Sequence, residues 1–222
     1  MLARQTQPRL LMAMTIAVCS AVLAHADLAT LARLAVSEDA AQAQGAIRQL
    51  RQAGPRAIDA LSAAHADALA RWDADQVDPA EMCGGDWARL RAAFDRVGGA
   101  CDNHAARLYW DTDLDQARAA AQASGRLVLS LRLLGNLDEE FSCAKSRYFR
   151  TTLYSDPRVA DLLRQQFVLH WKSVRPVPRI TIDFGDGRRI ERTITGHSVH
   201  YVLDAQGRPV DALPGLYTPQ TF

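Results

Sequence analysis

The sequence RLVLSLRL, residues 126–133, is apolar at most of its positions and shows no regular alternation. Such a run is typical of a strand that is buried on both faces of a sheet. FVLHW, residues 167–171, has the same character. LDQARAAAQASG, residues 114–125, predicts a helix that ends at Gly125, and residues 139–166 predict a helical segment interrupted before Asp156-Pro157. Helices therefore alternate with buried strands in this part of the chain.

Two antiparallel hairpins follow in the sequence. RITIDF and RRIERTIT flank the turn Gly185-Asp186-Gly187, and SVHYVLD and RPVDAL flank residues 205–207. Helix-strand-helix-strand followed by antiparallel strands predicts an α/β fold with a mixed sheet, and residues 179–195 form an added hairpin.

Residues 27–106 predict a small all-helical N-terminal region. Ala43, Ile47 and Leu50 share one helical stripe, and Gly54-Pro55 ends that helix and starts the next. A further helix ends at Gly98-Gly99. We expect this region to pack on an α/β domain formed by residues 107–222.

Residues 1–26 have the character of a secretory signal peptide. Two arginines precede an apolar run, and Ala24-His25-Ala26 fits the small-x-small cleavage rule. We therefore expect an exported protein, periplasmic or extracellular, with no membrane attachment after cleavage. The leader holds two of the 26 basic residues and none of the 25 acidic ones, so the mature chain has 24 basic and 25 acidic residues. This balance argues against nucleic acid as a partner.

The mature chain has three cysteines in a compartment where disulfides persist. Cys83 and Cys101 flank one short helix beside glycines, and we expect them to form the pair. Cys143 is then the free thiol, in the sequence FSCAKSRYF. The sequence lacks Walker, dinucleotide and metalloprotease motifs, and we expect no cofactor.

The sequence motifs around Cys143 resemble those of the thioredoxin-like superfamily, and the resemblance covers roughly residues 110–217. That family places its active cysteines at a helix N-terminus after a buried strand, and a phrase of the form SDP-x-V and a strand beginning F-V often follow. Here Ser155-Asp156-Pro157-Arg158-Val159 precedes Phe167-Val168, and Cys143 lies thirteen residues before Asp156. A second motif of the family, G-x-P-T followed by a strand and then D-x-x-G, lies nearer the C-terminus. It is matched here by residues 196–199 and 204–207.

The resemblance implies a role for each residue near Cys143. Cys143 matches the nucleophilic cysteine, and Ser146 falls on the resolving cysteine, so a two-cysteine shuttle is chemically impossible. Ser198 falls on the family's cis-proline, and we expect a trans bond there because a cis bond before a non-proline residue is costly. We expect His197 or Lys145 to favour the thiolate.

An apparent insertion, LLGNLDEEF, precedes the cysteine and is expected to bring Asp138, Glu139 and Glu140 beside the thiol. The thiol chemistry also requires that the sulfur of Cys143 be exposed at the start of its helix.

Three functions follow as hypotheses. The first is a monothiol oxidoreductase-like role, in which Cys143 forms a mixed disulfide with a protein thiol or disulfide partner. The second is a non-catalytic binding module that uses the helical region and the hairpin at 178–195. The third is a copper site that combines Cys143 with His197, His200 or His170.

The family's fold closes with a helix after the last hairpin, whereas this sequence stops at GLYTPQTF. Thr218 and Pro219 suit the start of a helix. The C-terminal helix is therefore expected to be missing, either because the protein dispenses with it or because the chain is a fragment. Without it, one face of the sheet is expected to be open and to expose Val199 or Val202.

Overall fold

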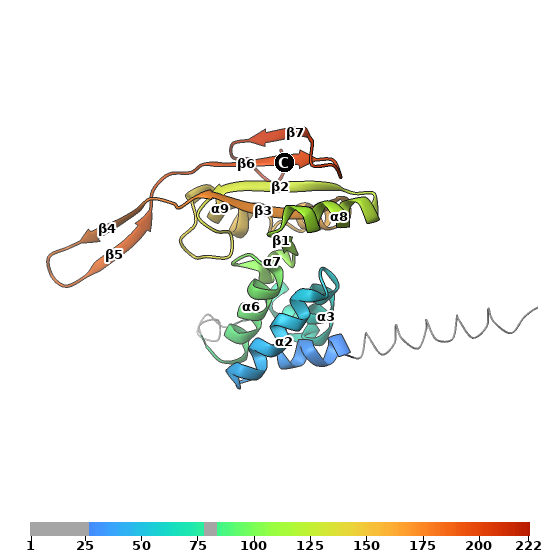
Figure 1. Ribbon diagram of the computed structural model, residues 1–222. Helices are drawn as coiled ribbons and strands as arrows, with labels where there is room; N and C mark the ends of the chain where they lie inside the picture. The colour runs from blue at the N-terminus through green and yellow to red at the C-terminus, as the bar shows by residue number, and fades with distance from the viewer. Residues whose placement is uncertain (1–26, 78–83) are drawn as a thin grey trace, which may run out of the picture.

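The computed structural model of the protein describes residues 27–77 and 84–222. Within them it forms a helical N-terminal region and an α/β region with a mixed five-stranded sheet (Figure 1). The predicted α/β class, mixed sheet and helical N-terminal region are confirmed. The proposed leader, residues 1–26, lies outside the described residues.

The N-terminal region begins with helical residues 27–34. The helices that follow are α2 (Ala40–Gln52), α3 (Arg56–Ala64), α4 (Ala66–Asp73), α6 (Gly85–Gly98) and α7 (Asn103–Ala106). Asp39 caps α2, because its side chain accepts hydrogen bonds from the backbone amides of Ala41 and Gln42. Gly99 ends α6 with a φ of 71°, in the left-handed region that favours glycine. Apolar faces of α2, α3 and α6 form a separate core around Leu50, Leu61 and Phe94.

The α/β region contains both sheets. Its helices are α8 (Leu114–Ser124), α9 (Ala144–Tyr148), the π-helix η1 (Phe149–Leu153) and α10 (Pro157–Gln166). Its strands are β1 (Trp110–Asp111), β2 (Leu127–Leu134), β3 (Phe167–Arg175), β4 (Arg179–Asp183), β5 (Arg189–Thr193), β6 (Ser198–Leu203) and β7 (Pro209–Pro214).

The main sheet has the strand order β1-β3-β2-β6-β7. Strands β1, β3 and β2 are parallel, whereas β6 and β7 run antiparallel to their neighbours. Strand β2 is therefore central, and its side chains enter two cores. Leu129, Leu131 and Leu133 face the larger core, and Val128 faces α8. This confirms that β2 is buried on both faces.

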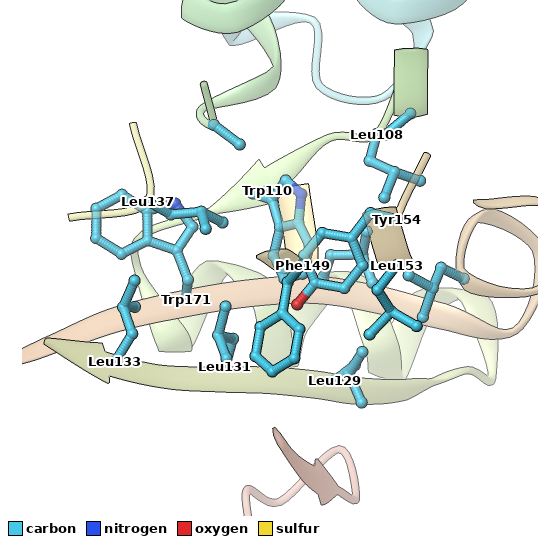
Figure 2. Close-up of a cluster of buried hydrophobic side chains, with 14 of the residues drawn as sticks. Leu108, Trp110, Leu129, Leu131, Leu133, Leu137, Phe149, Leu153, Tyr154 and Trp171 are labelled. Carbon is cyan, nitrogen blue, oxygen red and sulfur yellow. The ribbon is translucent and has the colours of Figure 1, made fainter. Parts of the chain in front are cut away.

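The larger core lies on the face of the sheet that η1 and α10 cover. Figure 2 shows Phe149, Tyr154 and Trp110 packed beside Leu129 and Leu131. The opposite face is covered by α8, whose Ala117 and Ala121 pack on Val128, Val168 and Leu203. Small residues on α8 let the helix approach the sheet closely.

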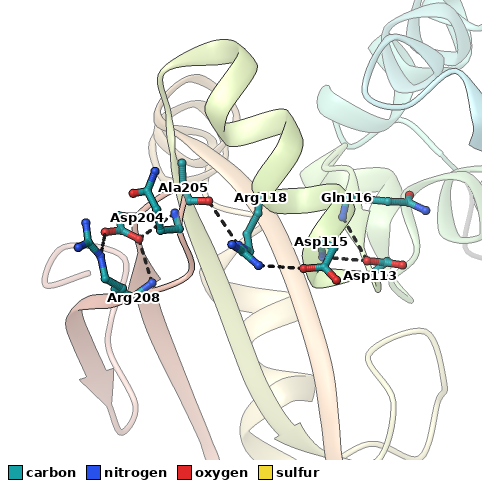
Figure 3. Close-up of polar contacts among 8 residues, drawn as sticks. Asp113, Asp115, Gln116, Arg118, Asp204, Ala205 and Arg208 are labelled. Carbon is teal, nitrogen blue, oxygen red and sulfur yellow. Dashed lines mark hydrogen bonds and ion pairs between the residues drawn. The ribbon is translucent and has the colours of Figure 1, made fainter.

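The start of α8 is tied to the β6–β7 turn (Figure 3). Asp113 caps the helix by accepting from the amides of Asp115 and Gln116. Arg118 forms an ion pair with Asp115 at 2.9 Å and donates to the Ala205 carbonyl at 3.4 Å.

The D-x-x-G motif, residues 204–207, forms the β6–β7 turn itself. The Asp204 carboxylate accepts from the amides of Gln206 and Arg208, both at 2.9 Å, and Gly207 has a φ of 81°.

Strands β4 and β5 form a separate two-stranded sheet that projects from the body of the molecule (Figure 1). We call residues 179–193 the β4–β5 arm. The predicted hairpin is thus confirmed, but it is not part of the main sheet.

The predicted exposure of Val199 or Val202 is wrong for the described chain. Val202 is buried in the larger core, and Val199 is half-buried. Phe222 packs against that core, with its ring 5.2 Å from the ring of His200, which shares a face of β6 with Val202. Val199 lies on the other face of the strand.

Arg51 joins the helical region to the sheet. Its guanidinium donates to the carbonyls of Val97, at 2.7 Å, and of Trp110 in β1. It also lies over the Tyr109 ring at 4.3 Å, and the Tyr109 hydroxyl donates to the Arg51 carbonyl.

Replacing Arg51 should therefore weaken the whole fold. We expect Arg51→Met to lower the free energy of unfolding by about 2 kcal/mol, because two carbonyls lose a charged donor. Arg48→Met, at an exposed position of the same helix, should change it by less than about 0.5 kcal/mol. Urea denaturation measures both variants, and equal effects would contradict the role of Arg51.

Candidate functional site

Cys143 connects the central strand to the helix that follows it. Its amide donates to the Leu134 carbonyl at the end of β2 at 3.1 Å, and its backbone is extended, with φ −64° and ψ 156°. Its sulfur accepts from the Ser146 amide at 3.4 Å and so caps α9. The helix therefore begins at Ala144, not at residue 139 as expected, and turns occupy most of residues 136–142.

Ser146 lies directly beside the sulfur. Its hydroxyl donates to the Cys143 carbonyl at 2.8 Å, and the Cys143 thiol lies 3.5 Å from the same hydroxyl oxygen. Both side chains are buried. The C-x-x-S spacing thus places a hydroxyl, not a second sulfur, next to the thiol.

Residues 194–197 cross in front of the sulfur, and we call them the cover segment. The Thr195 carbonyl accepts from the Ala144 amide at 3.2 Å. The His197 carbonyl lies 3.6 Å from the Cys143 sulfur, whereas the residue as a whole is exposed. The contact between His197 and the thiol is therefore made by its carbonyl, and no contact between its imidazole and the sulfur is observed.

Lys145 and Ser198 also border this site. Lys145 is half-buried, and its aliphatic stem packs against Gly196. No cis peptide bond occurs among the described residues, so the bond before Ser198 is trans as expected. The Ser198 hydroxyl oxygen is buried and has no hydrogen-bond partner within the described chain.

The sulfur of Cys143 is closed off from solvent. Cys143 is 0% exposed and belongs to the larger core, together with Leu134, Phe149 and Tyr154. The expectation of an exposed sulfur is wrong for this conformation. The sulfur is buried because core side chains pack against it on one side and the cover segment lies over it on the other.

A buried tyrosine–histidine pair lies in the same core. The Tyr154 hydroxyl and the His200 Nε2 atom are 2.6 Å apart. Burial raises the pKa of Tyr154 well above its ordinary value, and the charge of nearby Cys143 raises it further. Burial also lowers the pKa of His200 to about 4. The histidine is therefore held in its neutral form.

The histidines expected to form a copper site do not converge. The His170 Nδ1 atom forms a hydrogen bond with the Ser130 hydroxyl at 2.8 Å. Both side chains lie on the face of the sheet opposite the larger core. His200 faces the larger core, although strand alternation alone did not require it to face the thiol. Among residues 27–77 and 84–222 no group of three or more His, Cys, Asp or Glu side chains could hold a metal ion.

A buried arginine lies behind the cysteine loop, and sequence reasoning missed it. Arg150 in η1 is 2% exposed, forms an ion pair with Asp102 at 3.1 Å and lies 3.4 Å from the Ser142 hydroxyl. The sequence did contain a sign of it, since Arg150 directly follows Phe149 and precedes Leu153 by three residues. A charged side chain on an apolar helical face requires a buried partner.

The three acidic residues expected beside the thiol are exposed on the turns of residues 136–142. Glu139 accepts from the Asn136 side chain at 2.8 Å. The charge of Glu140 acts on Cys101, whose pKa is raised to about 12, mainly by burial.

Cys101 is a free thiol in the structure, and Cys83 lies outside the described residues. The expected pairing of these two cysteines therefore stays a prediction.

The comparisons with known proteins add no identity. Neither a protein-family model nor a curated protein matches the sequence. Among the described helices, none combines the length and the apolar character that a membrane span requires.

The buried histidines should make the folded state less stable at acidic pH. Burial lowers the pKa of His104, His170 and His200 to about 4 each, below the unfolded value of about 6.5. Their stability contribution is present above pH 6.5 and is lost as the pH falls toward 4. Asp95 acts in the opposite direction, because burial raises its pKa to about 6.

At pH 5 the protein should therefore take up about two protons when it unfolds. The urea concentration at the unfolding midpoint should decrease as the pH is lowered from 7 to 5. His200→Gln should flatten this dependence by about one proton. A urea midpoint that stays constant over this range would contradict the neutral buried histidines.

Proposed function

We propose that this is a thioredoxin-like protein in which Cys143 carries out monothiol–disulfide exchange. The observation that carries the proposal is the position of the sulfur, which follows the central strand β2, caps α9 and lies under the segment that leads into β6. The strand order β1-β3-β2-β6-β7 is compatible with this proposal, whereas the trans bond before Ser198 departs from the family's cis-proline. A role outside the cytoplasm, after removal of the leader, is part of the proposal.

The chemistry needs only one sulfur from this chain. The Cys143 thiol releases its proton, and its thiolate attacks a disulfide of a partner protein. A new S–S bond to Cys143 forms while the partner's S–S bond breaks, and one partner thiolate leaves. A second thiol then attacks the mixed disulfide and releases Cys143. No metal or organic cofactor takes part.

Access to the sulfur requires movement of the cover segment. Its contacts with the site are the Thr195–Ala144 hydrogen bond, the His197 carbonyl at the sulfur, and the packing of the Lys145 stem on Gly196. Thr195 has a φ of 87°, which a β-branched residue rarely adopts, and such backbone conformations cost about 1–3 kcal/mol. Release of this strain favours opening, which gives a partner access to Cys143.

A trapped adduct tests this proposal. We expect the purified mature chain, treated with glutathione disulfide, to carry glutathione on Cys143, identified by mass spectrometry of its peptides. Cys143→Ser should lose this adduct completely, and Cys101→Ser, the matched control, should retain it. A native chain in which Cys143 stays unmodified at every disulfide concentration would contradict the proposal.

One observation favours a second function, a binding module. Ile180, Ile182 and Phe184 alternate along the β4–β5 arm and are 37%, 43% and 49% exposed. An isolated two-stranded hairpin is only marginally stable in water, so this apolar face suits a partner surface. The base of the arm adjoins the thiol site, because Thr193 donates to the Ser142 carbonyl at 2.9 Å.

The two functions differ in which variant abolishes binding. For a binding module we expect Ile182→Lys to remove partner binding, measured by affinity capture and quantitative mass spectrometry, whereas Cys143→Ala leaves it intact. Thr181→Lys, on the opposite face of the arm and opposite Glu191, is the matched control and should bind normally. Loss of binding in Cys143→Ala would contradict a purely non-catalytic role.

A further inference from the structure

A pocket of about 280 Å³ lies where the helical region meets the β1 edge of the main sheet. Its walls come from the turn between α2 and α3, from α8, from α10 and from the start of β3. Strand β1 pairs with β3 only at Leu169 and His170, so within the described chain no strand covers this edge of β3 at Phe167 and Val168. The short pairing leaves the space that the pocket occupies.

The walls of this pocket are largely apolar. Leu108 and Leu169 are buried members of the larger core, and Val168 belongs to the cluster under α8. Pro55 and Ala120 line the pocket from the helices on either side. An apolar lining with a few polar groups is typical of sites that bind small molecules.

The charged side chains of the lining are Arg51, Asp111, Arg126 and Arg164. Arg164 forms an ion pair with Asp161 at 2.6 Å. Arg51 donates to the carbonyl of Trp110, which directly precedes Asp111. Burial raises the pKa of Asp111, and the nearby charge of Arg51 opposes that rise. Two of the three arginines therefore lie beside a carboxylate.

Arg126 is the cation of the pocket whose charge is not balanced. Its Nε donates to the Ser124 hydroxyl at 3.1 Å, and its Nη1 donates to the carbonyls of Arg164 and Phe167 at 3.1 and 3.2 Å. Among the described residues it forms no ion pair with a carboxylate, and its Nη2 group has no hydrogen-bond partner there. A half-buried guanidinium fixed by carbonyls, with donors still available, suits a carboxylate ligand.

The basic and acidic groups lie at different levels of the same strand. Arg126 is held at the Phe167 carbonyl, whereas Asp111 is paired in register with His170, three residues further along β3. At a rise of about 3.3 Å per residue these two levels are about 10 Å apart. A ligand that places a carboxylate at Arg126 and extends along β3 therefore brings its other end toward Asp111.

We propose that this pocket binds a monocarboxylate with an apolar chain, whose carboxylate pairs with Arg126 and whose chain lies along the edge of β3. Asp111 excludes a second carboxylate at the far end of the ligand. A free organic acid and the C-terminus of a peptide share this chemistry. Cys143 is not among the lining residues, so the site is independent of the proposed thiol function.

Calorimetric titration of the full chain with octanoate tests the proposal. We expect saturable binding of one octanoate per chain at pH 7. Suberate, the dicarboxylate of the same chain length, should bind at least tenfold more weakly, because its second carboxylate meets Asp111. Asp111→Asn removes this repulsion and should bring the affinity for suberate to within about twofold of that for octanoate.

Variants of the pocket identify its location. Arg126→Gln should weaken octanoate binding by about tenfold, the worth of a hydrogen-bonded charge, and Arg48→Gln on the exposed face of α2 should not change it. Ala120→Leu fills the pocket and keeps every charge, so it should abolish binding even if Arg126→Gln folds poorly. Ala119→Leu, exposed on the same helix and not part of the lining, is its matched control.

N-acetyl-leucyl-leucine, which has a free C-terminal carboxylate, separates the two sources of the ligand. Tighter binding of this dipeptide than of octanoate assigns the site to a peptide C-terminus, and weaker binding assigns it to a free acid. A parent chain that does not bind octanoate saturably, or that binds octanoate and suberate equally, would overturn the inference. Unchanged octanoate binding in a folded Ala120→Leu variant would overturn it as well. None of these results bears on the reactivity of Cys143.

Discussion

The hydrogen bond from the Cys143 amide to the Leu134 carbonyl ends β2 and fixes the residue at which the next helix starts. The Cys143 backbone is extended there, its sulfur accepts from the Ser146 amide, and its carbonyl accepts from the Arg147 amide. Ser146 is then brought against the sulfur by one turn of helix. The cover segment meets the same turn through the Ala144 amide. The geometry of the candidate site therefore follows from where one strand stops.

The same arrangement creates a conflict between capping and reactivity. A sulfur that accepts the Ser146 amide as a helix cap and lies in an aliphatic and aromatic core is closed to a partner disulfide in this conformation. The π-helix η1, a rare element often found at functional sites, places Phe149 and Tyr154 together in the core that contains the sulfur. In the proposed exchange, the closed conformation has to open at the cover segment before a partner disulfide can reach the sulfur.

Local sequence patterns predicted the parts of the fold that local chemistry decides. The apolar runs gave β2 and β3, Gly54, Gly99 and Gly125 ended helices through left-handed backbone, and Asp204 with Gly207 closed a turn. The local pattern placed the helix start wrongly at residue 139, and only the resemblance around Cys143 put that residue at a helix N-terminus.

What the sequence could not predict depends on residues distant along the chain. The burial of Cys143 depends on the core side chains on one side and the cover segment on the other, and Phe222, at the other end of the domain's sequence, packs against the same core. Arg150 has its partner at Asp102, forty-eight residues earlier, and no local pattern reports such a pair. The position of His200 against Tyr154 depends on the register of β6 on β2, which pairs His200 with Leu131.

The urea dependence of Cys143 reactivity tests the central claim most directly. If the sulfur becomes accessible by movement of the cover segment alone, its reaction with a disulfide probe should saturate at high probe concentration and change little with urea below the unfolding transition. A reaction that occurs only through unfolding of the whole protein, with the full urea dependence of global denaturation, would contradict the account. Cys143 would then be a structural residue of the core.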